Sequence, residues 1–143
     1  MFDSTKILND DELQALRKRY DEDEVSPQRL ALQATAALFP PGRDFVTSVS
    51  DVIYGIREPS NFIAPVDREI QLLTLFTISG QSFQLAVHCY WAILIGLSPH
   101  DVATTLLLAS VTAGIDEYVS AIGVMTKVMH ILKNLAPTEP TPE

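Results

Sequence analysis

The chain has 143 residues, of which 47% are hydrophobic and 20% charged, and this suffices for one domain with a buried core. A net charge of −8 argues against partners that carry many phosphates, so we expect binding neither to nucleic acid nor to an anionic membrane surface. The single cysteine excludes an intrachain disulfide, and the N-terminus is too polar for a secretory signal. The longest apolar run, LAVHCYWAILIGL, is too short for a membrane span of about 20 residues. We therefore expect a soluble protein of the reducing cytoplasm.

Helix signals begin near the N-terminus and dominate the chain. Asn9 and Glu12 form an N-cap and N3 pair before an amphipathic stretch. A second helix is expected over 26–39, between Ser-Pro and Pro-Pro, and a third amphipathic segment over 43–55. Sustained alternation of apolar and polar residues and Asn-Gly or Asp-Gly hairpin turns are both missing from the sequence. The pattern predicts an all-α protein.

Four further helices are predicted in the second half of the chain. Glycines mark the ends of three of them, and a Ser-Pro-x-Asp start opens one. Their expected ranges are 66–79, 82–95, 99–113 and 116–135. We expect residues 1–135 to form a single all-α domain, and the acidic, Pro-rich tail 136–143 to be disordered.

The three predicted helices within 66–114 are apolar on nearly every face. A helix that is apolar all round must be buried all round, and a domain of this size has little interior for three such helices. We therefore expect a homo-oligomer in which these helices share a core across subunits.

Two ionisable residues, Glu69 and His88, lie within this apolar region. A histidine on an apolar helix is either a core residue whose nitrogens are hydrogen-bonded, or a general acid or base. A glutamate near a helix start is either a partner of the helix dipole or part of a site. The residues alone leave both alternatives open.

Other candidates for chemistry are weaker. Cys89 follows His88 directly, and neighbours on a helix point about 100° apart, so we expect a small buried side chain and no Cys–His nucleophile pair. His100 and His130 occupy predicted surface positions, and no histidine has further ligands at metal-binding spacing. A glycine-rich phosphate loop is also missing. We expect neither a metal nor a cofactor.

The spacing around the two ionisable residues follows a recognisable pattern. Glu69 is followed by eleven residues, Gln81, two residues, Gln84, three residues and His88, and then by GLSPHDVATTLLLASVTAG. Residues 68–132 resemble the carboxymuconolactone decarboxylase family, which includes the alkyl hydroperoxidase D proteins and has Cys where this chain has the two glutamines. The resemblance implies an alkyl hydroperoxidase D-like helical bundle with a core over about 60–132, assembled as a trimer or hexamer.

The two glutamines determine which activity the resemblance can imply. In the hydroperoxidase branch, the cysteine pair cycles between dithiol and disulfide. An amide cannot be oxidised in this way, so we do not expect a thiol peroxidase. The decarboxylases of the family lack the cysteine pair and act on small lactone acids. Near the predicted site only Arg68 can pair with a substrate carboxylate.

The resulting prediction is a site built around Glu69 and His88. His88 would transfer a proton to or from the substrate, and Glu69 would orient it. The resemblance implies that Gln81 and Gln84, on the helical face of His88, line the site. The predicted substrate-binding residues are Gln81, Gln84, Phe83, Tyr90, Trp91 and Arg68.

Two hypotheses for function follow. The favoured one is a cofactor-independent lyase or isomerase that acts on a small organic molecule by decarboxylation, isomerisation, cyclisation or ring opening. The alternative is a non-catalytic, oligomeric ligand-binding or scaffold protein with the same fold. Loss of turnover on substitution of His88 would support the enzyme, whereas ligand binding without turnover would support the non-catalytic protein.

Overall fold

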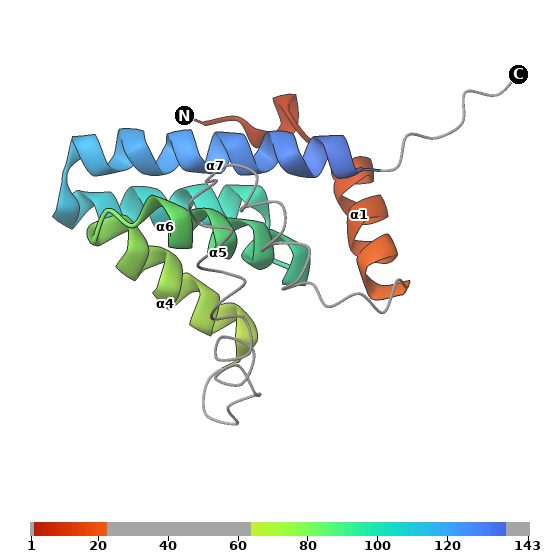
Figure 1. Cartoon of the computed structure of the whole chain (residues 1–143), viewed down its shortest axis with the longest axis horizontal. Helices are drawn as coiled ribbons and strands as arrows, with labels where there is room; N and C mark the ends of the chain where they lie inside the picture. Colours follow the sequence, from red (N-terminus) through yellow and green to blue (C-terminus); the bar gives the residue numbers. More distant parts are fainter. Residues whose placement is uncertain (1, 23–63, 137–143) are drawn as a thin grey trace, which may run out of the picture.

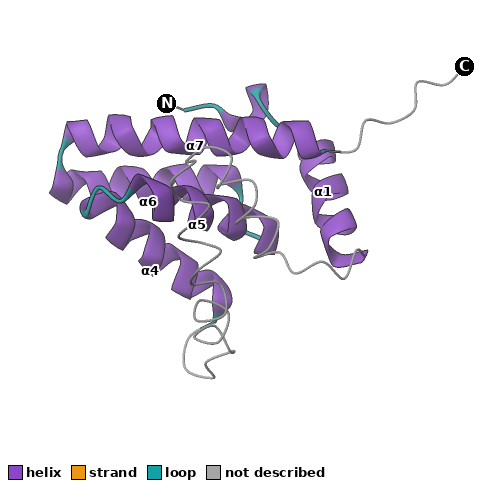
Figure 2. Cartoon of the chain, in the orientation of Figure 1, coloured by secondary structure: helices purple, strands orange, loops and turns teal. Residues whose placement is uncertain are grey.

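The computed structural model describes residues 2–22 and 64–136. Within these ranges the chain forms α-helices, one 3-10 turn at Ser4–Lys6 and short connections, without any strand (Figures 1 and 2). The all-α class is thus confirmed for the described residues. The helices expected over 26–39 and 43–55, and the tail from residue 137 onwards, lie outside them.

The described helices match the predicted ranges closely. Helices α5 and α6 and the end of α7 fall at the predicted residues, and the other boundaries differ by one or two residues. The helices are α1 (Asp10–Glu22), α4 (Pro65–Ile78), α5 (Ser82–Ile95), α6 (Pro99–Ala113) and α7 (Ile115–Leu135). None of these helices is both long enough and apolar enough to cross a membrane.

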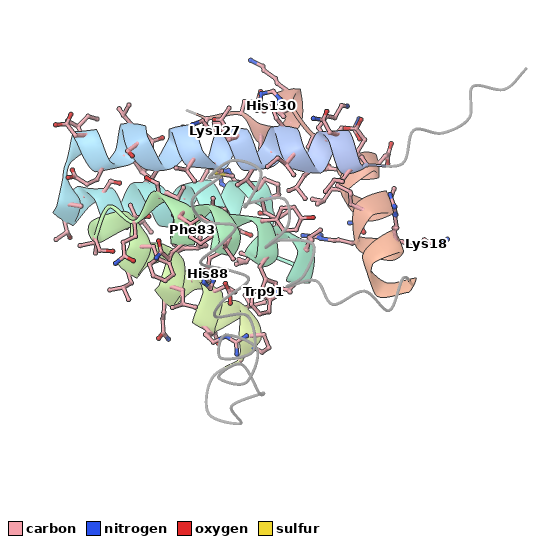
Figure 3. All side chains as sticks on the ribbon, viewed as in Figure 1. Lys18, Phe83, His88, Trp91, Lys127 and His130 are labelled. Atoms are coloured by element: carbon pink, nitrogen blue, oxygen red, sulfur yellow. The ribbon has the colours of Figure 1, made fainter. Side chains whose placement is uncertain are left out.

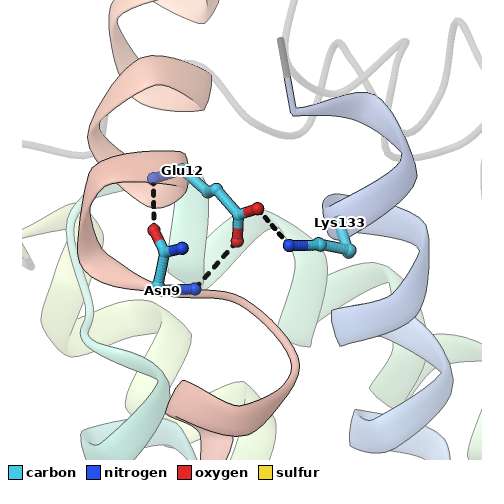
Figure 4. A network of polar contacts seen from close by, with 3 residues as sticks. All are labelled: Asn9, Glu12 and Lys133. Atoms are coloured by element: carbon cyan, nitrogen blue, oxygen red, sulfur yellow. Dashed lines mark hydrogen bonds and ion pairs between the residues drawn. The ribbon is translucent and has the colours of Figure 1, made fainter. Parts of the chain in front are cut away.

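Local polar contacts explain why the helices begin where they do. The backbone N–H of Glu12 donates to Asn9 Oδ1 at 2.9 Å, and Glu12 Oε2 accepts from the N–H of Asn9 at 3.0 Å, as predicted (Figure 4). Ser98 caps α6 in the same way, because its Oγ accepts from the N–H of Asp101 at 3.0 Å. The other Glu12 oxygen accepts a hydrogen bond from Lys133 of α7, which holds the pKa of the Glu12 carboxyl below its usual range.

Helices α4 to α7 form a four-helix bundle. Around the bundle the order of neighbours is α4, α5, α7 and α6, so α4 packs on both α5 and α6. Helix α5 is the most deeply buried, since all of its side chains from residue 85 to residue 94 lie in the interior. Completely buried partners on the neighbouring helices include Leu73, Leu106, Met125 and Met129. Each such side chain stabilises the fold by roughly 1.5–3 kcal/mol relative to exposure.

A single chain therefore buries α5 on every face, although we expected this to need a second subunit. Helices α4 and α6 differ from α5, because each leaves large apolar side chains exposed near its C-terminal end. For these two helices the oligomer expected from the sequence stays a prediction.

Helix α1 packs on α5 and α7 through an arginine. The Arg17 guanidinium donates to the carbonyl of Ile93 at 2.9 and 3.1 Å and to that of Leu97 at 3.0 Å. Carbonyls at the C-terminal end of a helix lack regular helical partners, and Arg17 donates to one in the last turn of α5 and to one two residues beyond it. Its partial burial lowers the pKa of the guanidinium without displacing it from the charged state.

Replacing Arg17 with Ala should lower the free energy of unfolding by about 1–3 kcal/mol, because two half-buried carbonyls lose a charged donor. Urea denaturation followed by circular dichroism measures this change. Gln14→Ala, at an exposed position of the same helix, is the matched control and should cost much less. Equal losses in the two variants would mean that Arg17 does not anchor α1.

Candidate functional site

Glu69 is the fifth residue of α4 and belongs to its buried face. Together with Leu73 and Thr77, it recurs at intervals of four residues, which places all three on one side of the helix. The Glu69 side chain is completely inaccessible to solvent. The carboxylate thus faces the bundle and leaves the dipole-partner position near the helix start to Asp67.

His88 lies in the middle of α5 and meets Glu69 across the α4–α5 interface. The distance from His88 Nδ1 to Glu69 Oε2 is 2.7 Å, and the imidazole is 6% exposed. This is the distance of a short hydrogen bond, and a Glu69 carboxylate, which can only accept, takes it from the Nδ1–H of His88. Figure 3 shows His88 on the side of α5 that faces α4. The structure therefore brings the two predicted catalytic residues together.

The second carboxylate oxygen of Glu69 has a different environment. Oε1 is buried and accepts no hydrogen bond from any described residue. Among the described residues, the cation paired with it is Arg68, whose Nε lies 3.6 Å away, within range of an ion pair but too far for a good hydrogen bond. Buried polar atoms nearly always have a partner, so Oε1 has unused capacity to accept a proton or a hydrogen bond.

Two aromatic rings lie beside the imidazole. The Phe76 ring centroid is 5.1 Å from that of His88, and the Trp91 ring is 6.3 Å away and stacked on it. The Arg68 guanidinium lies 5.9 Å from the Trp91 ring centroid, close enough for a cation–π contact. Two predicted binding residues, Trp91 and Arg68, thus belong to this site.

Phe76 was missed in the sequence analysis. It follows Glu69 by seven residues, which is two helical turns, so it shares the face of α4 that carries the carboxylate. That spacing was visible in the sequence and could have identified it.

The other predicted binding residues lie farther from the pair. Gln81 is the exposed N-cap of α5, Gln84 is half-buried, and neither hydrogen-bonds to Glu69 or His88 within the described part of the chain. Phe83 is half-buried at the start of α5 (Figure 3). Tyr90 belongs to the main core. It follows His88 by two residues, so the two side chains point about 200° apart around the helix.

Sulfur and metal chemistry find no support in the described residues. Cys89 is completely buried, and this burial, together with the nearby Glu69 charge, raises the pKa of its thiol far above the usual range. Residues 2–22 and 64–136 contain no group of three or more His, Cys, Asp or Glu side chains that could hold a metal ion.

Comparisons of the chain with protein-family models, with curated proteins and with solved structures found no match. The chemistry available to the site must therefore be argued from its own geometry. That geometry comprises a carboxylate that lies within ion-pair distance of both an imidazole and a guanidinium, beside two aromatic rings.

Tyr90 should make stability sensitive to alkaline pH. Burial raises the pKa of its phenol from 10.0 to about 12, although the Arg19 charge opposes this shift. Because the folded-state pKa is the higher one, the contribution of Tyr90 to stability is complete below pH 10.0 and is lost as the pH rises to about 12. We expect a loss of about 1–2 kcal/mol across this interval.

Urea denaturation at several pH values between 9 and ~12 measures this loss. In Tyr90→Phe the free energy of unfolding should fall less across the same pH interval, by the contribution of the phenol. This difference does not depend on what the substitution does to stability at neutral pH. The same slope in both proteins would show that the phenol is not held neutral by burial.

Cys89 should be protected from thiol reagents in the folded protein. Because the thiol is buried and neutral, labelling by an aromatic disulfide reagent requires the chain to open. We expect native labelling to be slower than labelling in denaturant by on the order of a thousandfold. Complete labelling of the native protein within minutes would reopen the case for sulfur chemistry.

Proposed function

We propose that this chain is a cofactor-independent acid/base enzyme of the carboxymuconolactone decarboxylase-like family, acting on a small organic molecule. The observation that carries the proposal is the buried 2.7 Å contact between Glu69 and His88. In this proposal the protein works in the cytoplasm as a homo-oligomer, a trimer or a hexamer. Gln81 and Gln84 contribute to binding, as the family resemblance implies.

The proposed roles follow from which atoms face each other. We assign the exchange of a proton with the substrate to Nε2 of His88, because Nδ1 contacts Glu69. The carboxylate fixes the ring orientation and the tautomer, and it stabilises the imidazolium once Nε2 has taken a proton. Glu69 is thus a positioning residue, and His88 is the catalytic residue.

The surroundings of the imidazole suit proton transfer to or from carbon. Phe76 and Trp91 cover the ring with apolar surface, which strengthens each electrostatic interaction beside it. A carbanion or enolate formed next to such a site is shielded from protons of bulk water. Transient charge on the substrate is then controlled by the protein groups alone.

The charges of the site indicate which intermediates it favours. Arg68 and Glu69 compensate each other, so the cluster becomes positive by one charge when His88 is protonated. A substrate that carries or develops a single negative charge restores neutrality. In a decarboxylation, His88 takes the proton of the substrate's carboxylic acid, the C–C bond to that carboxylate breaks and CO₂ leaves. The electron pair stays on the substrate as an enolate, and the imidazolium returns the same proton to carbon.

The same charge balance applies to isomerisation, cyclisation and ring opening through an enolate. In each, His88 removes a proton from one carbon and returns it to another atom of the substrate. Thiol peroxidase activity is not part of the proposal, because the only thiol of the chain is buried and neutral. A non-catalytic ligand-binding or scaffold protein is the alternative outcome.

The proposal predicts proton transfer that depends on His88. The protein is incubated in D₂O with a panel of small β-keto acids, lactone acids and enolisable ketones, and proton NMR follows deuterium uptake, loss of CO₂ and ring opening. We expect at least one compound to react. His88→Gln should lower its rate by roughly 10²–10⁴-fold, and Glu69→Gln should lower it because the ring is no longer oriented.

His100→Gln and His130→Gln are the matched controls, because they make the same chemical change at exposed positions of α6 and α7. Both should retain the wild-type rate. A His88→Gln protein that reacts as fast as His130→Gln would rule out the proposed role. Binding of panel compounds without turnover would support the non-catalytic alternative.

A further inference from the structure

One end of the helix bundle exposes an unusual number of large apolar side chains. Seven of them are between 42% and 79% accessible to solvent. We call this set the apolar end; its members are Leu75, Ile78, Leu107, Leu108, Val111, Ile115 and Val119. Isolated exposed leucines are common on protein surfaces, but a concentration of this kind indicates an interaction site.

The seven side chains belong to neighbouring helix ends. Helices α4 and α6 run in the same direction and pack on each other, so their last turns and the first turns of α7 meet at the end that holds the Gly80 and Gly114 turns (Figure 1). An open groove of about 390 Å³ joins α6 to α7 there. It is lined by Leu107, Ser110, Val111, Gly114, Ile115 and Tyr118.

The helical spacing shows that this surface is a regular face. Leu107, Leu108 and Val111 lie on one side of α6, whereas Leu106, four residues after the buried Val102, points into the core with no exposure. Ile115 and Val119 are four residues apart and extend the same apolar stripe onto α7. The bundle therefore satisfies its own core and still presents a second apolar surface.

The size of the apolar end matches an interface. At on the order of 100 Å² for each side chain, it exposes roughly 700 Å² of apolar surface. The largest patch on a typical monomer is about 300–600 Å², and each partner of a standard interface buries about 800 Å². An area of this size fits a stable contact with another folded protein.

The charge distribution favours a second copy of this chain as the partner. The protein carries a net charge of −8, so two copies repel each other over most of their surfaces. Between Glu69 and Asp116, however, the only Asp, Glu, Lys or Arg is Asp101, at the opposite end of α6. The α6 part of the apolar end therefore brings no carboxylate to the contact, and Asp116 and Glu117 of α7 line a different hollow, beside the Gly80 turn.

We propose that the apolar end is the surface through which copies of this chain associate. This inference rests on the self-association in the proposed function and adds its location; it does not depend on the proposed chemistry. Val111 and Ile115, the two most exposed members, form the centre of the contact, and the groove between α6 and α7 receives apolar side chains of the other copy.

The test is the molar mass of the full chain in solution, measured by size-exclusion chromatography with light scattering. The wild type should have a mass that is a multiple of 15.8 kDa. Leu108→Glu and Val111→Glu should each weaken association by roughly a hundredfold or more, shifting the mass to that of the monomer. Leu108 is 66% exposed and Val111 is 79% exposed, so neither substitution disturbs the core of the subunit.

Leu135→Glu is the matched control, because it makes the same change at an exposed position at the far end of α7 and should leave the mass unchanged. Circular dichroism confirms that each variant is folded. A wild type that is monomeric over the whole concentration range would overturn the proposal, and so would an oligomer that survives both substitutions. His88→Gln should keep the oligomer, so loss of activity and loss of assembly are distinguishable.

Discussion

A carboxylate and an imidazole that are withdrawn from water must each find a partner, and Glu69 of α4 and His88 of α5 find each other across 2.7 Å. Burying either group alone would cost several kcal/mol, so each makes the position of the other tolerable. Because the contact requires one register between α4 and α5, it also constrains how the most buried helix sits in the bundle. The packing of Phe76 and Trp91 around the imidazole depends on that register.

Stability and chemistry are supported by different parts of the molecule. Helices α5 and α7 supply most of the deep apolar core, and Arg17 of α1 donates hydrogen bonds to a carbonyl in the last turn of α5. The Glu69–His88 pair lies between α4 and α5, where Glu69 Oε1 is 3.6 Å from Arg68 Nε and accepts no hydrogen bond from the residues that the structure describes. A bundle designed only for stability would place an apolar pair there. The retained polar group is what makes the site a candidate for function.

The sequence was informative wherever the determining interactions are local. Helix starts at Asn9 and Ser98 and the helix end at Gly114 depend on residues within one turn, and the structure has them as predicted. The contact of Glu69 with His88 joins different helices, and the family spacing suggested it. Tyr90, a predicted binding residue, lies in the main core, and no contact among the described residues joins it to His88. An all-apolar helix gives no signal of which face meets which neighbour. Exposure at the apolar end likewise depends on the assembled bundle.

The most direct measurement of the central claim is the proton between His88 and Glu69. In protein with ¹⁵N-labelled histidine, a proton–nitrogen NMR spectrum should show an Nδ1–H signal of His88 that is shifted strongly downfield and protected from solvent exchange. The exposed His100 and His130 should show no such signal. Glu69→Gln should move or abolish the His88 signal alone. A His88 ring without a protected Nδ1 proton, or one that is indifferent to Glu69→Gln, would contradict a coupled acid/base pair.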